Sequence, residues 1–364
     1  MPRRLPRPIH RWSLAATAGA LLALAPALAS AQWSSITFFG DSFSDMGLSD
    51  VLAAAAGIPD PTPEPPYWPG PPPFNFPGTT TNGPTWTAYF ASLLGRPGDG
   101  LTAIAPPGIP SGNNFAISGA RTGLFGTAGY PIGLQSQLGL FAGFSPPGVS
   151  LTLTPRVVDP NGLYVVWAGV NDIRDLADLA PANPLPAIQT AVANVAGVVA
   201  SLAANGARSF LVPQAPNSSV VPEVALSPAT AARRAAYTAT FNALLAGAIA
   251  QLSVQFPTAR FSTFDLNPLY AAIVADAATG GTQYGITNVD RPCLPGFGVP
   301  ASDCDVALFS DALHPTTRAH ALVAGVAFDA VAAIATPEPS TVALVAGGLA
   351  LLGVGARRTR RRAA

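Results

Sequence analysis

The chain of 364 residues contains no lysine, and all 19 of its basic residues are arginines. Together with abundant alanine, proline and glycine, this absence indicates only the bias of a GC-rich genome. Nine arginines lie in the two terminal segments; without them and Glu338, 10 arginines face 18 acidic residues, a net charge of −8. Because proteins that bind nucleic acid present a basic surface, this balance argues against nucleic acid as a partner.

Cysteine is also scarce, since only Cys293 and Cys304 are present. Two thiols without nearby histidines cannot complete a zinc shell, so the pair argues against a metal site. The two residues lie in a loop that is rich in proline and glycine. In an exported protein such a pair is more often a disulfide than a metal site, and we predict a disulfide between them.

The amino-terminal segment has the layout of a secretory signal. Arginines begin it, an apolar run follows at 14–28, and small residues at 29–31 supply a cleavage site. The paired arginines at 3–4 admit a twin-arginine route, but prolines and a leucine flank them, so the general secretory route is favoured. We therefore predict a signal peptide over 1–31 and an exported protein that begins near Gln32.

The carboxyl-terminal segment has an apolar run at 342–354, shorter than the ~20 residues of a membrane span, although small neighbours can extend it. A Pro-Glu-Pro motif precedes the run, and arginines at 357–362 would hold its end in the cytoplasm. This order resembles the PEP-CTERM sorting signal of Gram-negative bacteria that make exopolysaccharide. The resemblance implies that an exosortase-type enzyme cleaves within 336–364 and delivers the protein to the outer surface or the medium. Membrane contact is then confined to this segment before processing, and a plain tail anchor is the alternative.

The body at 32–335 shows no internal repeat and is long enough for one sizeable core. Apolar strand-type segments alternate in it with helices, which indicates βαβ units and a parallel sheet covered on both faces. The expected strands lie near 36–39, 163–167, 209–213 and 260–264, and the expected helices at 51–56, 85–94, 134–141, 187–204, 228–256 and 316–334. We predict an α/β fold of the three-layer α/β/α type.

A proline-rich stretch at 59–77 is too poor in regular structure for helix or sheet, and we expect it to cross the surface as a long loop. It contains four aromatic residues: Tyr67, Trp68, Phe74 and Phe76. These aromatics either form one rim of an apolar substrate cleft or pack the loop onto the body.

The segment Gly40-Asp41-Ser42 follows the first predicted strand, and its composition is typical of a turn that lifts one hydroxyl out of the strand end. By itself the tripeptide is more often a strand followed by a helix cap. Gly119 and Asn171 also follow predicted strands. Since ligand sites of open parallel sheets lie at the carboxyl ends of the strands, these segments can meet there, and we interpret Ser42 as a nucleophile.

The scarcity of histidine limits the choice of a base, because the body contains only His314 and His320. His314 lies in a loop before a helix, three residues after Asp311, whereas His320 lies inside the helix among alanines. The three-residue spacing puts both side chains on one side of a turn, where Asp311 can fix the tautomer of the imidazole. We assign His314 as the base, Asp311 as its orienting group and His320 as structural; Asp311 as a plain turn cap is the alternative.

Three groups are candidate donors to a developing oxyanion: the backbone N–H of Ser42, the backbone N–H of Gly119 and the side-chain amide of Asn171. Gly119 has no side chain to block a close approach. Asn171 presents a neutral amide beside a strand end. An ordinary turn glycine and a helix cap formed with Asp172 are the alternatives for the last two.

Four blocks resemble, in order, those of the GDSL, or SGNH, hydrolases. They are Gly40-Asp41-Ser42, Asn114-Phe115-Ala116-Ile117-Ser118-Gly119, Gly169-Val170-Asn171-Asp172 and Asp311-Ala312-Leu313-His314-Pro315. Each block is weak alone, but the ordered set covers nearly the whole body. The resemblance implies a flavodoxin-like sandwich, Ser42 as nucleophile, His314 and Asp311 as its base and orienter, Gly119 and Asn171 as oxyanion donors, and no metal or cofactor.

Asn82-Gly83-Pro84-Thr85-Trp86 further resembles the subgroup that contains plant GDSL esterases and bacterial lipase-like or haemolysin-like members. The chain departs from the family at two positions. Phe43 stands where the family name has leucine, which is an apolar exchange of little consequence. Leu48 stands where many relatives have asparagine, which puts local contacts in doubt rather than activity.

These parts predict an exported serine esterase or lipase that cleaves carboxylic esters through an acyl-enzyme on Ser42. Its substrate is either a lipid ester, favoured by the aromatic loop, or an O-acylated glycan, favoured by the sorting signal. No Gly-x-Ser-x-Gly elbow occurs, which argues against a conventional α/β-hydrolase. The alternative function is a catalytically silent binding protein of the cell surface or exopolysaccharide matrix, against which the full set of catalytic residues argues.

Overall fold

The computed structural model describes residues 33–57, 78–105, 110–127, 130, 132–146, 148–149, 151, 153–294, 303–332, 334 and 348. The expected signal peptide and the proline-rich stretch at 59–77 with its four aromatics lie outside these residues. The expected sorting segment lies outside them too, apart from residue 348. Residues 33–334 form one compact unit.

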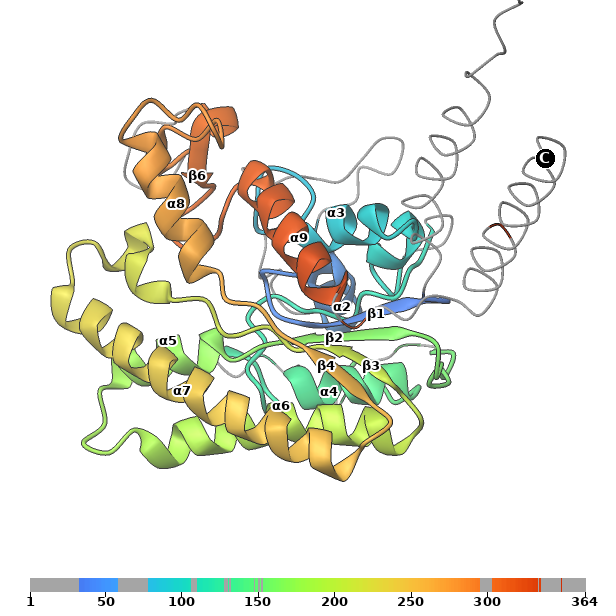
Figure 1. Cartoon of the computed structure of the whole chain (residues 1–364). Coiled ribbons are helices and arrows are strands. Elements are labelled where there is room, and N and C mark those ends of the chain that lie inside the picture. The colour runs from blue at the N-terminus through green and yellow to red at the C-terminus, as the bar shows by residue number, and fades with distance from the viewer. Residues whose placement is uncertain are drawn as a thin grey trace, which may run out of the picture. The chain divides into compact units, whose positions relative to one another are not determined.

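Four parallel strands form the central sheet (Figure 1). They stand in the order β1 (Ile36–Gly40), β2 (Leu163–Trp167), β3 (Ser209–Leu211) and β4 (Arg260–Ser262). On the other side of β1, the segment 113–117 runs parallel to it, and the N–H of Phe115 donates to the carbonyl of Phe38 at 2.8 Å. When this segment is counted, the strands stand in the chain order 2-1-3-4-5, which is the flavodoxin-like order.

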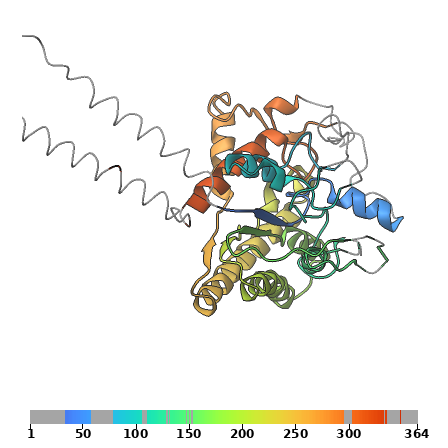
Figure 2. The ribbon, with the colours of Figure 1, turned by 90° about the vertical axis from the view of Figure 1, so that its right-hand side faces the viewer.

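Helices cover both faces of the sheet (Figures 1 and 2). One face carries α3 (Trp86–Leu93) and α9 (Thr317–Ala332), and the other carries α4 (Leu134–Phe141), α6 (Leu185–Ala204) and α7 (Pro228–Gln255). Side chains alternate between the faces, so Phe38 and Val165 pack with the first group, whereas Phe39 and Val166 pack with the second. The predicted three-layer sandwich around a parallel sheet is confirmed.

The helices on both faces explain why β1 and β2 consist mostly of apolar residues. All five residues of each strand are buried, because helices exclude water from both faces. Among the described residues, α6 alone is long and apolar enough to cross a membrane. It instead contributes a row of buried residues from Ile188 to Leu202 to the core on its face of the sheet.

Several elements differ from the sequence-based expectation. Helix α2 (Leu48–Ala56) begins three residues before its expected start at 51. Two helices were not predicted, α5 (Val170–Leu179) and α8 (Asn267–Ala277). A second, two-stranded parallel sheet of β5 (Asn288–Pro292) and β6 (Ala307–Phe309) was not predicted either.

The two cysteines lie beside this small sheet. Cys293 directly follows β5, and Cys304 begins the short 3₁₀ helix η6 (Cys304–Val306) that leads into β6. Their sulfur atoms are bonded, with the Cα atoms 5.1 Å apart. The disulfide therefore links the end of β5 to the start of η6, shortly before the segment that carries Asp311 and His314.

Candidate active site

Ser42 lies in a tight turn at the carboxyl end of β1. The carbonyl of Asp41 accepts from the N–H groups of Ser44 and Asp45 at 2.9 and 3.0 Å, which folds the backbone back over one turn. Gly40 permits this path, because a Cβ atom at this position would lie 2.7 Å from the carbonyl oxygen of Trp167. The turn leaves the Ser42 side chain at the sheet edge, with 7% of the residue exposed.

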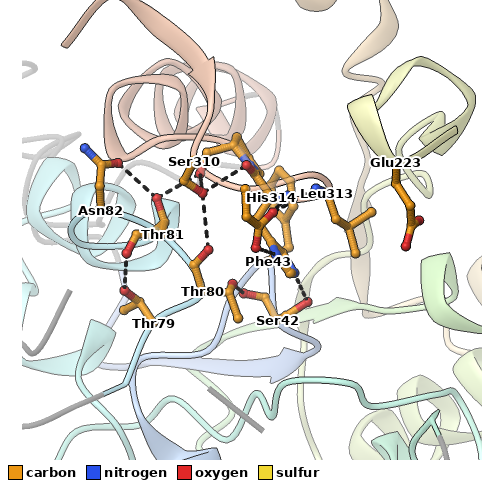
Figure 3. A network of polar contacts seen from close by, with 12 residues as sticks. Ser42, Phe43, Thr79, Thr80, Thr81, Asn82, Glu223, Ser310, Leu313 and His314 are labelled. Carbon is orange, nitrogen blue, oxygen red and sulfur yellow. Dashed lines mark hydrogen bonds and ion pairs between the residues drawn. The ribbon is translucent and has the colours of Figure 1, made fainter. Parts of the chain in front are cut away.

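The structure brings Ser42, His314 and Asp311 into one chain of contacts. The Oγ atom of Ser42 lies 2.8 Å from Nε2 of His314, and Nδ1 of His314 lies 2.7 Å from Oδ2 of Asp311. Figure 3 shows His314 directed at Ser42 from the loop before α9. The three side chains thus stand in the spatial order that acyl transfer requires of a nucleophile, a base and an orienting carboxylate.

The second oxygen of Asp311 fixes the loop itself. Its Oδ1 atom accepts from the backbone N–H groups of Leu313 and His314 at 2.8 and 2.5 Å. Burial raises the pKa of Asp311, but the charge of His314 and these hydrogen bonds outweigh burial and lower the pKa below its ordinary value. The carboxylate of Asp311 is therefore ionised at neutral pH.

The three expected oxyanion donors lie at the ends of neighbouring strands. Among the described residues, the backbone N–H groups of Ser42 and Gly119 have no acceptor within the protein. Gly119 has φ +74°, the left-handed conformation that favours glycine. Asn171 lies in the first turn of α5, is buried, and donates one of its two amide hydrogens to the carbonyl of Ala120 at 2.9 Å. Asn171 also forms part of the pocket lining with Ser42 and His314.

Comparison with known proteins identifies the family of the chain. A model of the family described as GDSL-like Lipase/Acylhydrolase matches residues 36–325. The chain belongs to this family. A second model, the PEP-CTERM protein-sorting motif, matches residues 335–362, so this GDSL acylhydrolase carries the C-terminal sorting tail of a secreted protein. No curated protein sequence matches the chain.

Three solved esterase structures are similar to the GDSL hydrolase. An acetyl xylan esterase is 13% identical, with 82% of this chain and 99% of that chain covered and a TM-score of 0.37. An M. Smegmatis aryl esterase in an inhibitor-bound form is 15% identical, with 83% and 99% covered and a TM-score of 0.38. A carbohydrate acetylesterase from Sinorhizobium meliloti is 14% identical, with 82% and 99% covered and a TM-score of 0.35. Similarity at this level carries no information on the substrate of this chain.

Asp45 has a role in the GDSL hydrolase that the sequence did not suggest. Its Oδ1 atom accepts from the backbone N–H groups of Gly47 and Leu48, at the start of α2, at 2.9 Å each. Its Oδ2 atom accepts from the N–H and the hydroxyl of Ser118, at 2.8 and 2.9 Å, and from the hydroxyl of Ser49. Because Ser118 precedes Gly119, one carboxylate joins the nucleophile turn to the donor segment. The helix-capping part is visible in the sequence as an aspartate before an apolar helix, whereas the contact with Ser118 is not.

The segment at 79–83 connects the nucleophile turn with the histidine loop (Figure 3). The hydroxyl of Thr80 donates to the carbonyl of Ser42 at 3.1 Å, and the hydroxyl of Thr81 donates to the carbonyl of Pro315 at 2.8 Å. The side-chain oxygen of Asn82 accepts from the N–H of Thr317 at 2.9 Å, at the start of α9. The segment at 79–83 thus helps to set the distance between Ser42 and His314.

A pocket of about 920 Å³, which includes space open to solvent, begins at Ser42 and His314. Its walls come from α5, the segment 216–221, α8, β6 and the first half of α9. Gly119 does not contribute to the lining. Among the described residues, no group of three or more histidine, cysteine, aspartate or glutamate side chains is placed to hold a metal ion.

Two further carboxyl groups lie beside the site. Burial, together with the negative charge of Asp172, raises the pKa of Asp41 to about 7, against the opposing N–H of Phe43 and charge of His314. Burial also raises the pKa of Asp172 to about 6, although Asp172 accepts from the N–H and hydroxyl of Thr122 at 2.9 and 2.8 Å. Asp172 thereby holds the segment after Gly119 on α5, and Asp41 holds the turn at Ser42 through the N–H of Phe43.

His320 does not take part in the catalytic contacts. Its ring is fully buried in α9 and meets the ring of Phe43 edge-on, with centroids 4.9 Å apart. Within the described part of the chain, neither ring nitrogen has a hydrogen-bond partner. Burial, and secondarily the charge of His314, lower the pKa of His320 from 6.5 to about 3, so the ring is neutral in the folded protein.

Replacement of His320 by leucine is expected to reduce the loss of stability in acid. Between pH 6.5 and about 3 the unfolded chain binds a proton at His320 that the folded protein does not bind, so stability falls as the pH drops below 6.5. Relative to wild type, His320→Leu should gain roughly 3 kcal/mol of unfolding free energy between pH 8 and pH 4. Urea unfolding at both pH values measures this gain, and an equal effect of the substitution at both would contradict a neutral buried imidazole.

Proposed function

We propose that this GDSL acylhydrolase is a serine esterase that cleaves carboxylic esters through an acyl-enzyme on Ser42. The observation that carries the proposal is the unbroken chain of contacts from Asp311 through His314 to Ser42, with 2.7 and 2.8 Å between the paired atoms. Helix capping by the Ser42 hydroxyl would not explain a contact with His314, whose second ring nitrogen lies against the buried carboxylate of Asp311.

The reaction proceeds in two halves. Oγ of Ser42 attacks the ester carbonyl carbon while Nε2 of His314 takes its proton, and the negative charge on the carbonyl oxygen is met by the N–H groups of Ser42 and Gly119 and the amide of Asn171. The tetrahedral intermediate then expels the alcohol, which receives the proton from His314. Water repeats the attack on the acyl group with the same base, and the acid and free Ser42 are released.

Asp311 and the donors lower the barrier in different ways. The ionised Asp311 holds the proton on Nδ1, so that Nε2 stays open to accept from Ser42, and it stabilises the imidazolium that forms. The donors are held in place before the reaction begins. Ser118, the residue before Gly119, is hydrogen-bonded to Asp45, and the side chain of Asn171 is hydrogen-bonded to the carbonyl of Ala120. Groups that need no reorganisation stabilise the developing charge most strongly.

The proposed setting is the cell exterior. The layout comprises a signal peptide at 1–31, a hydrolase domain at 32–335 and a sorting segment at 336–364 that an exosortase-type enzyme processes. The sorting motif supports delivery to the outer surface of a Gram-negative cell or to the medium. The Asn82-to-Trp86 motif, which contacts the start of α9, supports placement in the plant-lipase-like or haemolysin-like subgroup.

Covalent labelling tests the nucleophile directly. A p-nitrophenyl alkylphosphonate should release p-nitrophenol once and leave the phosphonyl group on Ser42, because the phosphorus imitates the tetrahedral intermediate. Mass spectrometry of the peptide from this turn should find the group on Ser42 and none on Ser44, which serves as an internal control two residues away. Labelling of another residue, or none, would contradict the assignment.

A further inference from the structure

The pocket at the catalytic residues is lined mostly by apolar side chains. Its walls carry aliphatic side chains from five separate segments, among them Val221, Leu269, Ile273, Leu308, Leu313 and Val323. Ile273 and Leu308 belong to one hydrophobic cluster, with the small sheet and α8, whereas Val323 belongs to the cluster between α9 and the central sheet. The pocket thus leads from Ser42 into the contact between two hydrophobic clusters.

Three aliphatic residues of the lining lie on regular elements of the fold and are nearly fully buried. Ile273 is 2% exposed, Val323 is 4% exposed and Leu308 is 5% exposed. Ile273 and Val323 lie on helices, and Leu308 lies on β6. Side chains on such elements keep the shape of a cavity better than loop residues do, so this wall can discriminate between ligands by length.

Some polar groups of the lining belong to the catalytic end or are engaged elsewhere, and Ser218, Asn267 and Tyr270 add three more. Asn171 and His314 belong to the reaction, and the guanidinium of Arg174 is paired with both carboxylate oxygens of Glu223. The side-chain oxygen of Asn217 accepts from the N–H of Ser219, and the buried hydroxyl of Ser218 has no partner within the described residues. A sugar ring would lose the hydration of several hydroxyl groups here and find few replacements, which favours a hydrocarbon ligand.

We propose that this pocket binds the acyl chain of the ester, and that the enzyme prefers straight, medium-length acyl groups over acetyl. The inference rests on the proposed function, since the pocket matters for turnover only if Ser42 is acylated. The acyl chain stays bound to Ser42 through both halves of the reaction, whereas the alcohol must leave between them. A wall of buried aliphatic side chains therefore suits the group that stays, and it selects a lipid-type ester over an acetylated glycan.

Two series of substrates separate the acyl from the alcohol side. With p-nitrophenyl acetate, butyrate, hexanoate and octanoate, kcat/KM should rise about fourfold for each methylene that enters the pocket, and fall once the chain exceeds its length. With acetate esters of alcohols of increasing length, kcat/KM should change little. A preference for acetyl in the first series, or a length dependence confined to the second, would overturn the inference.

Substitutions at Ile273 test whether this part of the pocket wall contacts the acyl chain. Ile273→Phe should shift the preferred acyl group toward butyrate, and Ile273→Ala should shift it toward octanoate, each changing the octanoate-to-butyrate ratio of kcat/KM about tenfold. The ratio is taken within one variant, so it does not depend on the fraction of protein that is folded. Ile188→Phe and Ile188→Ala are the matched controls, because Ile188 is 3% exposed but lies on α6, outside this pocket.

The outcomes distinguish this inference from the proposed function. If the Ile273 variants keep the wild-type octanoate-to-butyrate ratio of kcat/KM while Ser42-dependent hydrolysis is intact, the pocket assignment alone is overturned. Absence of hydrolysis across both series and of phosphonate labelling at Ser42 would instead overturn the proposed function. An equal shift in the Ile188 variants would show that the ratio reports general loosening of the core and would also overturn the pocket assignment.

Discussion

Ser42→Ala is expected to lower kcat for p-nitrophenyl butyrate by about 10⁴- to 10⁶-fold, because no other group can form the acyl-enzyme. The fold should tolerate the change. The Ser42 hydroxyl contacts His314 at 2.8 Å, and water can replace it there because the His314 side chain is 13% exposed. The unfolding free energy should change by less than about 1 kcal/mol. Hydrolysis rates and urea unfolding of the same preparation measure both effects.

Ser44→Ala is the matched control, since Ser44 stands two residues further along the same turn. Its hydroxyl accepts from Nε1 of Trp86 at 3.0 Å, and both residues are almost fully buried. Removal of the hydroxyl leaves the indole N–H without an acceptor, which should cost about 1–3 kcal/mol of stability while folded molecules keep their activity. The two serines should therefore show opposite patterns. Activity within tenfold of wild type in Ser42→Ala would reject the nucleophile.

Asp311→Asn is expected to lower kcat by about 10³- to 10⁴-fold, through the tautomer of His314. One carboxylate oxygen accepts two backbone N–H groups, and the other faces Nδ1 of His314 at 2.7 Å. Asparagine can keep the backbone contacts only by placing its oxygen there, which turns its NH₂ group toward Nδ1. His314 then carries its proton on Nε2 and cannot accept from Ser42. The pH profile of kcat and the unfolding curve of the variant are the measurements.

The same variant decides between the two interpretations of Asp311 that the sequence left open. A plain turn cap would be preserved in Asp311→Asn, because the contacts to Leu313 and His314 survive, and kcat would then fall less than tenfold. Asp311→Ala removes both functions and should also lower the unfolding free energy by about 1–2 kcal/mol. A drop in kcat for Asp311→Ala alone would therefore make Asp311 structural.

The sequence predicts the fold well where the apolar pattern is unambiguous. β1 and β2 are buried on both faces, and α4 and β2 have the expected bounds at 134–141 and 163–167. α5 was missed although Ile173, Leu176 and Ala177 recur at helical spacing, because residues 168–172 were interpreted only as the turn after a strand. β5 was missed because Asn288 to Arg291 are exposed or only partly buried, three of these four residues are polar, and the segment lacks the alternation of a buried strand.

Parts of the site could also be anticipated from the chain. The residues near Ser42, Gly119 and Asn171 follow predicted strands, and parallel strands end at one edge, so their proximity follows from topology. Asp45 could not be found in this way. Its contact with Ser118 crosses 73 residues, and a short-range pattern carries no information on which distant donors a buried carboxylate will meet.

The origin of the pocket walls has a consequence for how this scaffold can diversify. The reacting groups are held by contacts among the β1 turn, the Ser118 segment, α5 and the loop before α9, through side chains such as Asp45 and Thr81. Part of the pocket wall is supplied instead by α8, which carries none of those groups, whereas β6 holds the loop of His314 through the carbonyls of Ala307 and Leu308, which accept from the hydroxyl and the N–H of Thr316. Mutation in α8 can thus alter which ester is accepted without disturbing the chemistry, so specificity and catalysis are free to evolve separately.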